Sequence, residues 1–592
     1  MSRTKQIYLI AFFFLLMLTA AFAAGCTTEP EPEPLPAQVT GTLEEINGNT
    51  ITILNEAGES LSYETAEYLC YCHTQINDVH SSQLGITTQP LNHLPRGTAV
   101  TLNLENGGTL VTNLQSVLSD NPHEYISWQG VDTCLSCHIE EAKDMHESVH
   151  YQWAGISLGT AQGTTIGPAL QGKIAGAFNT FCINILGNWE TCGNCHVGLG
   201  LEPTAEQTQE QLENIDCLIC HQQAYKRVEV NGIFQPDTAK MTITMDEAAQ
   251  TVHRPVKANC LQCHAKGGGG DSLKRGDLSL AHAVTGDVNF DVHMATNGAN
   301  LECVDCHIFN DHRAPGRGSD LRVSDSLIVP QCTDCHEDKL TSTGHKVQGV
   351  NNHVDKVACQ TCHIPIYGKN ADDTAASEAT ETHRTWLENE YTGTKYEPEL
   401  HLANDVTPVY LFWNKNSYMY NMYDQVVENP LTCHISISRP LGALNDPASK
   451  LYAFKYKTSE QPYAPNLGQL IALDTSVFFK TGDGNAAAIA GLVNMGYSAS
   501  ELVEWIIADE YLMLNHEVAP KEEALLCGAC HESTARIDLK ALGYVLKDST
   551  DVVCTQCHAD KSGENLSYYR MHQLHSEEKG YDCANCHGFT RK

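Results

Sequence analysis

The feature that most constrains this chain is a five-residue motif, C-x-x-C-H, which occurs ten times. Within one turn of a helix the two cysteines lie on the same face, and the histidine that follows can place its imidazole under the same ring. Two thioethers and one axial nitrogen are what covalent attachment of haem c requires. Structural zinc and disulfides also use C-x-x-C pairs, but neither needs a histidine after every second cysteine.

We therefore predict about ten covalently attached haem c groups as the cofactors of this chain. The predicted attachment residues are Cys134, Cys137, Cys192, Cys195, Cys217, Cys220, Cys260, Cys263, Cys303, Cys306, Cys332, Cys335, Cys359, Cys362, Cys527, Cys530, Cys554, Cys557, Cys583 and Cys586. The predicted proximal iron ligands are His138, His196, His221, His264, His307, His336, His363, His531, His558 and His587.

The composition narrows the class of protein further. Twenty of the 25 cysteines belong to the motifs, so a disulfide framework is not expected. The net charge of −35 makes nucleic acid and anionic membrane surfaces poor partners. Because 42% hydrophobic residues are spread among ten motifs, we expect much of the core to be porphyrin.

The first 25 residues are typical of a secretory signal. Arg3 and Lys5 precede an apolar run over 7–22, which is too short and wrongly flanked for a spanning helix. The sequence AAGC ends at Cys26, a candidate for lipidation, and an ordinary cleavage near Ala24 is the alternative. Residues 26–37 then form an acidic, proline-rich tether that cannot bury a core.

Residues 38–118 are predicted to form a small β domain. Apolar and polar residues alternate around the Asn-Gly pair at 47–48 and around Asn-Gly-Gly at 106–108, which predicts two hairpins. The domain also contains CYCH at 70–73, one residue short of the haem motif. A disulfide or chance pairing is the favoured interpretation of these cysteines, and an irregular haem or metal site is the alternative.

The rest of the chain divides by the density of motifs. Residues 119–375 hold seven motifs, residues 376–520 hold none, and residues 521–592 hold three. We therefore expect a mostly irregular or α-helical multihaem cytochrome, with little regular structure around a stacked haem chain and a small N-terminal β domain.

The motif-free segment is predicted to be partly helical. Apolar residues such as Val503, Ile506 and Ile507 mark one face of a predicted helix over 498–516. The same segment contains a lone half-motif, Cys433-His434, for which we predict a buried free thiol.

The second axial ligand decides what each haem does, because two strong ligands make an electron carrier and an open face makes a binding site. Ten of the 28 histidines belong to the motifs, and the 18 others are enough by count to complete all ten irons. The candidate distal ligands are His150, His253, His293, His312, His345, His353, His516, His572 and His575. Electron transfer is therefore the default interpretation.

Several longer strings resemble the octahaem tetrathionate reductase family of multihaem cytochromes. They are CLQCHAKGGGGDSLKRGDLS (260–279), DVHMATNGANLECVDCH (291–307), HVDKVACQTCHIP (353–365), ISRPLGALNDPASKLYAFKY (437–456) and ARIDLKALGY (535–544). The similarity covers roughly residues 131–546, in the same order along the chain.

The resemblance implies a periplasmic or extracellular cytochrome with closely stacked haems. It also implies reduction of tetrathionate, and of nitrite or hydroxylamine in vitro, at one haem with a lysine as axial ligand. That haem corresponds to the Cys192 motif, and the lysine would lie shortly after it, where this chain has Leu201 and Glu202. A carboxylate cannot reproduce a cationic pocket that attracts an oxyanion. Lys266, Lys274 or a histidine are candidates to replace the lost ligand in space.

A second departure lies at the C-terminus, where the motifs at Cys554 and Cys583 add two haems to the family's eight. His572 and His575 are placed to ligate these haems or an iron in a neighbouring subunit. Two added haems would lengthen a chain of haems that carries electrons, whereas an enzyme would gain little from them.

We predict an exported, lipid-anchored decahaem c-type cytochrome that transfers electrons in the periplasm or at the cell surface. Its partners would be redox partner cytochromes or quinol-linked donors, together with an extracytoplasmic electron acceptor. One alternative is a respiratory reductase of tetrathionate, nitrite or hydroxylamine at the haem of Cys192 and Cys195. Another is a subunit of a polymeric filament, formed by self-association. Whether the chain is an enzyme stays open, and no catalytic residue is assigned.

Overall fold

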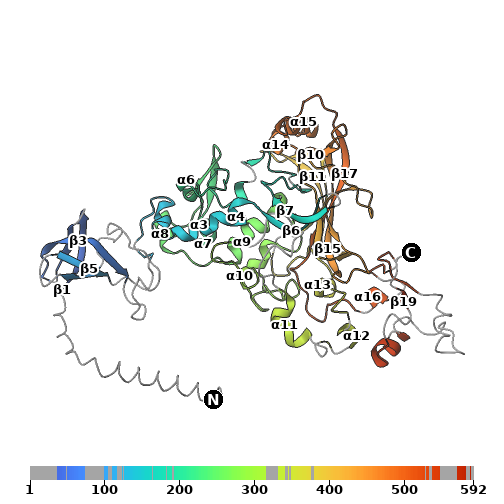
Figure 1. Cartoon of the computed structure of the whole chain (residues 1–592), viewed down its shortest axis with the longest axis horizontal. Helices are drawn as coiled ribbons and strands as arrows, with labels where there is room; N and C mark the ends of the chain where they lie inside the picture. Colours follow the sequence, from blue (N-terminus) through green and yellow to red (C-terminus); the bar gives the residue numbers. More distant parts are fainter. Residues whose placement is uncertain are drawn as a thin grey trace, which may run out of the picture. The chain divides into compact units, whose positions relative to one another are not determined.

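The structure is a computed structural model, and it divides the chain into two compact units, 1–126 and 127–592. Each unit is described by itself (Figure 1). The residues that the structure describes are 37–47, 50–55, 57–73, 99–104, 110–116, 123–124, 126–162, 165–181, 183–189, 193–314, 331–340, 345, 348–351, 353–374, 379–526, 528–531, 536–539, 541–546, 570–571, 573–581 and 587–588.

The N-terminal unit is a closed β-barrel with the strand order β1-β2-β3-β5-β4. The strands are β1 (Ala37–Asn47), β2 (Thr50–Leu54), β3 (Ser60–His73), β4 (Ala99–Leu104) and β5 (Leu110–Ser116). Both predicted hairpins are confirmed, because β1 pairs with β2 and β4 pairs with β5, each in antiparallel register. Alternate residues of the strands, including Leu43, Ile51, Ile53 and Leu102, fill the interior.

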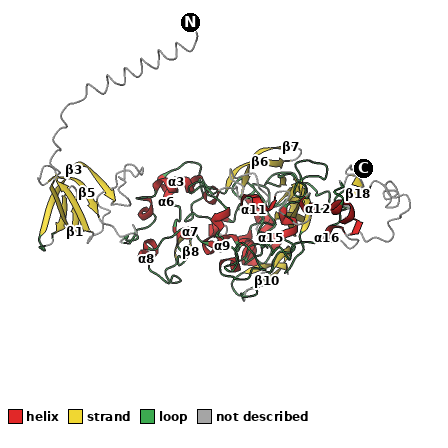
Figure 2. Ribbon diagram, turned by 90° about the horizontal axis from the view of Figure 1, so that it is seen from below, coloured by secondary structure: helices red, strands yellow, loops and turns green. Residues whose placement is uncertain are grey.

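The haem-motif region of the second unit consists of short helices joined by loops, as Figure 2 shows. The small hairpin β8 (Arg227–Val230) and β9 (Ile233–Pro236) lies among them in the chain. The helices are α2 (Asp132–Leu135), α3 (Ile139–Glu147), α4 (Val149–Gln152), η4 (Gly193–Cys195), α6 (Gln209–Glu213), α7 (Leu218–His221), α8 (Met245–Gln250), α9 (Lys257–His264), η5 (Gly267–Gly269), η6 (Leu280–Ala283), α10 (Cys303–Cys306), α11 (Cys332–Leu340), α12 (Gln348–Asn351) and α13 (Cys359–His363).

A ten-stranded sheet, which the sequence analysis did not predict, forms the rest of this unit. Its main path is β11-β10-β15-β17-β14-β13-β6-β7, and β12 and β16 pair with β15. The strands are β6 (Ala154–Gln162), β7 (Thr165–Gly172), β10 (Thr380–Tyr391), β11 (Tyr396–Ala403), β12 (Val409–Trp413), β13 (Asn416–Met419), β14 (Ile435–Leu441), β15 (Lys450–Ala464), β16 (Gln469–Leu470) and β17 (Glu504–Met513).

Two helices, α14 (Thr475–Thr481) and α15 (Gly484–Asn494), pack on one end of this sheet (Figure 1). Phe478 and Leu492 of these helices share a buried core with Trp386 of β10 and Ala508 of β17. The ring centroids of Trp386 and Phe478 lie 4.9 Å apart, in an edge-to-face arrangement. This core is independent of any haem motif.

The helix predicted over 498–516 is wrong, because residues 504–513 form strand β17. This strand lies between β15 and β14. Its residues from Ala508 to Met513 are buried in succession, as expected of a strand that is covered on both faces. Apolar residues at 503, 506 and 507 also recur at helical spacing, so periodicity alone does not distinguish this strand from a helix.

Four short elements complete the described chain: α16 (Gly528–His531), β18 (Val545–Leu546), the π-helical turn η8 (Gln573–Glu578) and β19 (His587–Gly588). Within the described ranges, no helix is both long enough and apolar enough to cross a membrane.

The barrel core can be tested by the substitution Ile53→Ala. Ile53 is fully buried, so we expect the free energy of unfolding of the barrel to fall by about 2–5 kcal/mol. The measurement is the guanidinium dependence of amide hydrogen exchange in the barrel strands. Thr52→Ala, at the half-buried neighbouring position, is the control and should cost less than about 1 kcal/mol. Equal losses for the two variants would contradict the packing described.

Candidate haem centres

The motif residues lie on short helices or directly beside them. Helices α2, α7, α9, α10, α11, α13 and α16 each carry residues of one motif, and η4 carries those of the Cys192 motif. Each chain segment therefore delivers its cysteines and histidine from a single turn, as the spacing requires. Cys26, Cys192, Cys527, Cys554, Cys557, His558, His572, Cys583 and Cys586 lie outside the described residues, and for His531 and His587 only the backbone is described.

Five of the candidate distal histidines each lie beside a proximal histidine, and the distance between the two rings is nearly the same in all five pairs. The distances between ring centroids are 6.0 Å for His150–His264, 6.0 Å for His221–His312, 6.1 Å for His293–His336, 6.2 Å for His307–His516 and 6.5 Å for His345–His363. In every pair one ring belongs to a motif and the other comes from a distant segment.

The size of this gap matches an iron atom between two imidazoles. A metal–nitrogen bond of about 2 Å, plus about 1.2 Å from the nitrogen to the ring centre, would place two imidazole centroids on opposite sides of an iron about 6.4 Å apart. Aromatic rings in contact also lie about 4.5–7 Å apart, so the recurrence of this distance at five motif histidines is what points to iron. The chain therefore fits haem at the motifs of Cys217, Cys260, Cys303, Cys332 and Cys359.

Hydrogen bonds fix the orientation of several of these rings. Nδ1 of His221 lies 2.9 Å from the carbonyl oxygen of His253, and Nδ1 of His345 lies 3.1 Å from Oδ1 of Asn351. Nδ1 of His516 lies 3.3 Å from Oδ2 of Asp277. A bond from Nδ1–H to an oxygen leaves Nε2 unprotonated, so Nε2 is the nitrogen offered to a metal.

The remaining predicted distal ligands are less closely defined. His253 and His575 also direct Nδ1 to backbone carbonyl oxygens, at 2.7 Å and 2.8 Å. The charges of His138 and His253 both lower the pKa of His221, after the larger effect of burial, so the three histidines lie near one another. His353 begins the loop that leads into α13, where its carbonyl oxygen accepts hydrogen bonds from the backbone N–H groups of Lys356 and Val357.

Contacts between cysteines of different motifs give the order of the sites. Hydrogen-bonding contacts join Cys134 to Cys217, Cys260 to Cys303, Cys332 to Cys359, and Cys195 to Cys263. Cys220 lies near Cys260, and Cys306 lies near Cys335. Cys362 and Cys530 both lie near Tyr410. Seven motifs thus follow one another in sequence order, and the Cys192 motif branches off at the Cys260 motif.

The Cys192 motif differs from the five paired sites. His196 is fully buried, its Nε2 lies 2.6 Å from the carbonyl oxygen of Tyr151, and its Nδ1 accepts a hydrogen bond from the backbone N–H of Gly198 at 2.9 Å. Burial lowers the pKa of His196 to about 4. The rings of Tyr151, Trp153 and Trp189 lie 5.1–5.2 Å away. Both ring nitrogens of His196 thus take part in hydrogen bonds, unlike the rings at the five paired sites, and its role as a proximal ligand stays a prediction.

Cations gather beside the same motif. A hydrogen bond from Cys263, together with the nearby charges of Arg227, Lys274 and Lys266, lowers the pKa of the Cys195 thiol to about 7, against the opposing effect of burial. Lys266 and Lys274, the candidates to replace the missing lysine, therefore lie near this site. Glu202, which stands at the expected lysine position, is exposed.

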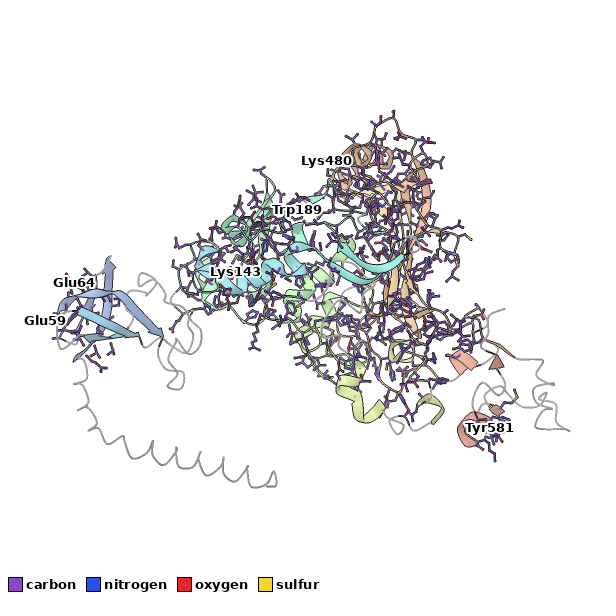
Figure 3. All side chains as sticks on the ribbon, viewed as in Figure 1. Glu59, Glu64, Lys143, Trp189, Lys480 and Tyr581 are labelled. Carbon is purple, nitrogen blue, oxygen red and sulfur yellow. The ribbon has the colours of Figure 1, made fainter. Side chains whose placement is uncertain are left out.

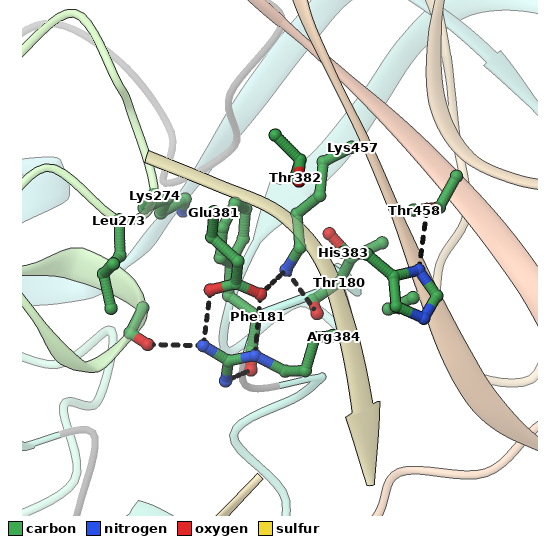
Figure 4. Close-up of polar contacts among 12 residues, drawn as sticks. Thr180, Phe181, Leu273, Lys274, Glu381, Thr382, His383, Arg384, Lys457 and Thr458 are labelled. Carbon is green, nitrogen blue, oxygen red and sulfur yellow. Dashed lines mark hydrogen bonds and ion pairs between the residues drawn. The ribbon is translucent and has the colours of Figure 1, made fainter. Parts of the chain in front are cut away.

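A buried ion network adjoins these cations, centred on Phe181 (Figure 4). The cationic groups of Lys457, Lys455, Lys274 and Arg384 lie 3.4, 5.4, 5.8 and 6.0 Å from the centre of its ring. Arg384 also donates hydrogen bonds to the carbonyl oxygens of Phe181 and Gly268.

Trp189, labelled in Figure 3, donates a hydrogen bond from Nε1 to the carbonyl oxygen of Gly200 at 2.7 Å.

The four consecutive glycines at 267–270 lie beside this network. Gly268 has a φ of 84°, in the left-handed region, and a Cβ there would lie 3.0 Å from the ring of Phe181. Glycine at 268 therefore permits both the backbone conformation and the close approach to the ring.

Glu381 holds the network together. Its carboxylate accepts hydrogen bonds from Nε and an Nη of Arg384 at 2.8 and 2.7 Å, and from Nζ of Lys457 at 2.5 Å (Figure 4). Lys457 also donates to the carbonyl oxygen of Thr180 at 2.9 Å, and Thr180 donates to Glu510. Burial lowers the pKa of Lys457 to about 7, against the opposing charge of Glu381.

The cysteines outside the haem motifs that follow the N-terminal segment are Cys70, Cys72, Cys182 and Cys433. Cys70 and Cys72 lie on β3, paired with Asn113 and Gln115 of β5, and their side chains are outside the described residues. Cys182 also lies outside them. The prediction that Cys433 is a buried thiol is wrong, because Cys433 is exposed. It sits at a left-handed turn with a φ of 61°, which turns it away from the sheet that buries its neighbours Ile437 and Ser436.

Removal of the central carboxylate tests the ion network. We expect Glu381→Gln to lower the free energy of unfolding by about 3–5 kcal/mol, because it leaves buried cations unpaired. Lys457→Met is the matched variant and should cost less, since Arg384 still pairs with Glu381. Guanidinium unfolding of both variants with the haems attached measures the two losses. A loss below about 1 kcal/mol for Glu381→Gln would contradict this account.

Comparisons with known proteins agree with this geometry. The family described as bacterial cytochrome c matches residues 368–534. An uncharacterized protein of Archaeoglobus fulgidus is 30% identical, and the match covers 31% of this chain and 75% of the relative. The crystal structure of an octahaem cytochrome c from Shewanella oneidensis has a TM-score of 0.60 and 29% identity, and the match covers 72% of this chain and 96% of that one.

Proposed function

The chain belongs to the multihaem c-type cytochromes related to the octahaem cytochrome c of Shewanella oneidensis, and from this premise we propose that it transfers electrons along a line of haem c groups. The observation that carries the proposal is the set of five histidine pairs at 6.0–6.5 Å. An iron held between two imidazoles has no open face, so it exchanges electrons without binding a substrate.

The order of the motifs supports a continuous conductor. Thioether sulfurs are bonded to the edges of porphyrins, so contact between cysteines of two motifs brings two porphyrin edges together. Electron tunnelling weakens steeply with the distance between cofactors, and the seven linked motifs keep that distance short. We propose that electrons pass from the Cys134 motif to the Cys527 motif, and onward through the motifs at Cys554 and Cys583.

The role of the protein in this mechanism is to hold and orient the ligands. The haems supply the redox change itself. Nδ1 hydrogen bonds orient the distal rings of His345 and His516 and the proximal ring of His221. Axial ligands, nearby charge and burial then set each reduction potential.

The proposal extends to the number of haems and to the location of the protein in the cell. We propose ten haems, export from the cytoplasm, attachment to a membrane through lipid on Cys26, and exchange of electrons with partner cytochromes or quinol-linked donors and an extracytoplasmic acceptor. The motifs and the signal-like first 25 residues support these statements. The acidic tether that follows Cys26 weighs mildly against a long filament.

Carbon monoxide tests the paired sites. It binds ferrous haem that lacks a strong sixth ligand, so we expect His312→Ala to bind one more carbon monoxide per reduced molecule than the unsubstituted chain. His434→Ala is the control, because His434 bonds through Nδ1 to the hydroxyl of Tyr456 at 3.1 Å and is not one of the five pairs. Visible spectroscopy during titration counts the sites. No additional site in His312→Ala would remove the support for electron transfer through paired irons.

A second candidate function is the reduction of a sulfur or nitrogen oxyanion at the Cys192 haem. Arg227, Lys266 and Lys274 near Cys195 favour it, because this cationic group would attract an anion in a chain that is otherwise strongly acidic. Within the described residues, no histidine pair of the kind found at the five other sites involves His196.

Turnover of nitrite or tetrathionate with a reduced dye tests this candidate. We expect Lys274→Met to lower kcat/KM by about tenfold or more, since it removes a charge that stabilises a bound anion. Lys395→Met, at an exposed turn between β10 and β11, should leave the rate unchanged. If the unsubstituted chain shows no turnover and no haem whose spectrum responds to nitrite, the chain is not such a reductase.

A further inference from the structure

Two of the five histidine pairs are nearly identical in geometry. His307 and His516 have ring centroids 6.2 Å apart and ring planes inclined at 33°. His345 and His363 have centroids 6.5 Å apart and planes inclined at 32°. The relative orientation of the two axial rings therefore does not distinguish the Cys303 haem from the Cys359 haem.

The two distal rings are also held by the same kind of bond. In each case one side-chain oxygen accepts hydrogen bonds from both the backbone N–H and Nδ1 of the histidine. For His345 the acceptor is Oδ1 of Asn351, at 3.0 and 3.1 Å. For His516 it is Oδ2 of Asp277, at 3.1 and 3.3 Å. The sites thus differ in that one acceptor is a neutral amide and the other is a carboxylate.

The surroundings of Asp277 keep this carboxylate ionised. Asp277 is fully buried, but Nε of Arg275 lies 3.3 Å from Oδ1, and the backbone N–H of Asn515 donates to Oδ2 at 2.8 Å. An ion pair with a guanidinium and a hydrogen bond from a backbone N–H both favour the ionised carboxylate over the neutral acid.

Arg275 offsets part of the negative charge without removing the asymmetry. Its guanidinium binds Oδ1 of Asp277, whereas Oδ2 faces His516. A second bond from Arg275 to the carbonyl oxygen of Met513, at 2.6 Å, holds the guanidinium on that side.

We propose that Asp277 is a positioning residue that lowers the reduction potential of the Cys303 haem below that of the Cys359 haem. A carboxylate that accepts the Nδ1–H bond draws the proton toward itself and makes the imidazole a stronger electron donor. A stronger donor stabilises ferric over ferrous iron. The inference rests on the proposed function, because it requires His516 to ligate the Cys303 iron.

The difference in reduction potential matters because of where the Cys303 haem lies in the line of haems. The Cys303 motif contacts the Cys260 motif on one side and, through Cys306 and Cys335, lies near the Cys332 motif on the other. The Cys303 haem would then be harder to reduce than the Cys359 haem further along the line.

Reciprocal substitutions of the same shape test the proposal. In Asp277→Asn the acceptor becomes neutral, and one haem should shift to higher potential. In Asn351→Asp the acceptor becomes charged, and one haem should shift to lower potential. Optical redox titration of the complete haem-loaded chain measures both, with low-temperature EPR of the ferric haems at each potential to follow individual low-spin signals. The difference between variant and unsubstituted titration curves should amount to one electron.

The outcomes separate this inference from the proposed function. His516→Ala should convert one low-spin ferric haem to high spin; if it does not, His516 is not an iron ligand and the proposed ligation fails. If it does, but Asp277→Asn shifts no potential, only the role of Asp277 is overturned. Should Asp277→Asn fail to fold, Asn351→Asp still decides, because an unchanged or raised potential at the Cys359 haem would overturn the proposal.

Discussion

The distance between paired imidazoles is the constraint on which the rest of this structure depends. Each of the five pairs needs a motif histidine and a partner from a distant segment to meet at 6.0–6.5 Å. The partners come from α4, from loops after η6 and α10, from the loop before α12, and from the chain that leaves β17. Regular secondary structure repeats a local geometry and cannot deliver so many single residues to separate points. The short helices and long connections of 127–363 are the result.

The sheet serves as the frame for part of this arrangement. β17 leads directly to His516, and β10 carries Glu381 and Arg384 into contact with Phe181 and Gly268 of the haem-motif region. The matched family region, 368–534, covers every strand of this sheet except β6 and β7 and includes one haem motif near its end. The region that matches the family therefore includes most of the frame and the segment that carries His516.

The sequence predicts the parts of this molecule that depend on local chemistry. The motifs are read directly because attachment needs two cysteines and a histidine within one turn, and the barrel hairpins follow from Asn-Gly turns between alternating strands. Pairings across long distances leave no local pattern. Asp277 meets His516 over 239 positions of sequence, and β6 joins the sheet through β13, far along the chain. The helix prediction fails at β17 because burial on both faces removes the alternation that marks a strand.

The length of the motif helices has a consequence for how they keep their shape. Helices α2, α7, α10 and α16 have four residues each, which is far below the length at which a helix is stable in water by itself. Tertiary packing must therefore hold these turns in shape. A haem bonded to both cysteines of a turn would add a covalent constraint to that packing, so we expect the chain without thioether bonds to lose order first at these helices.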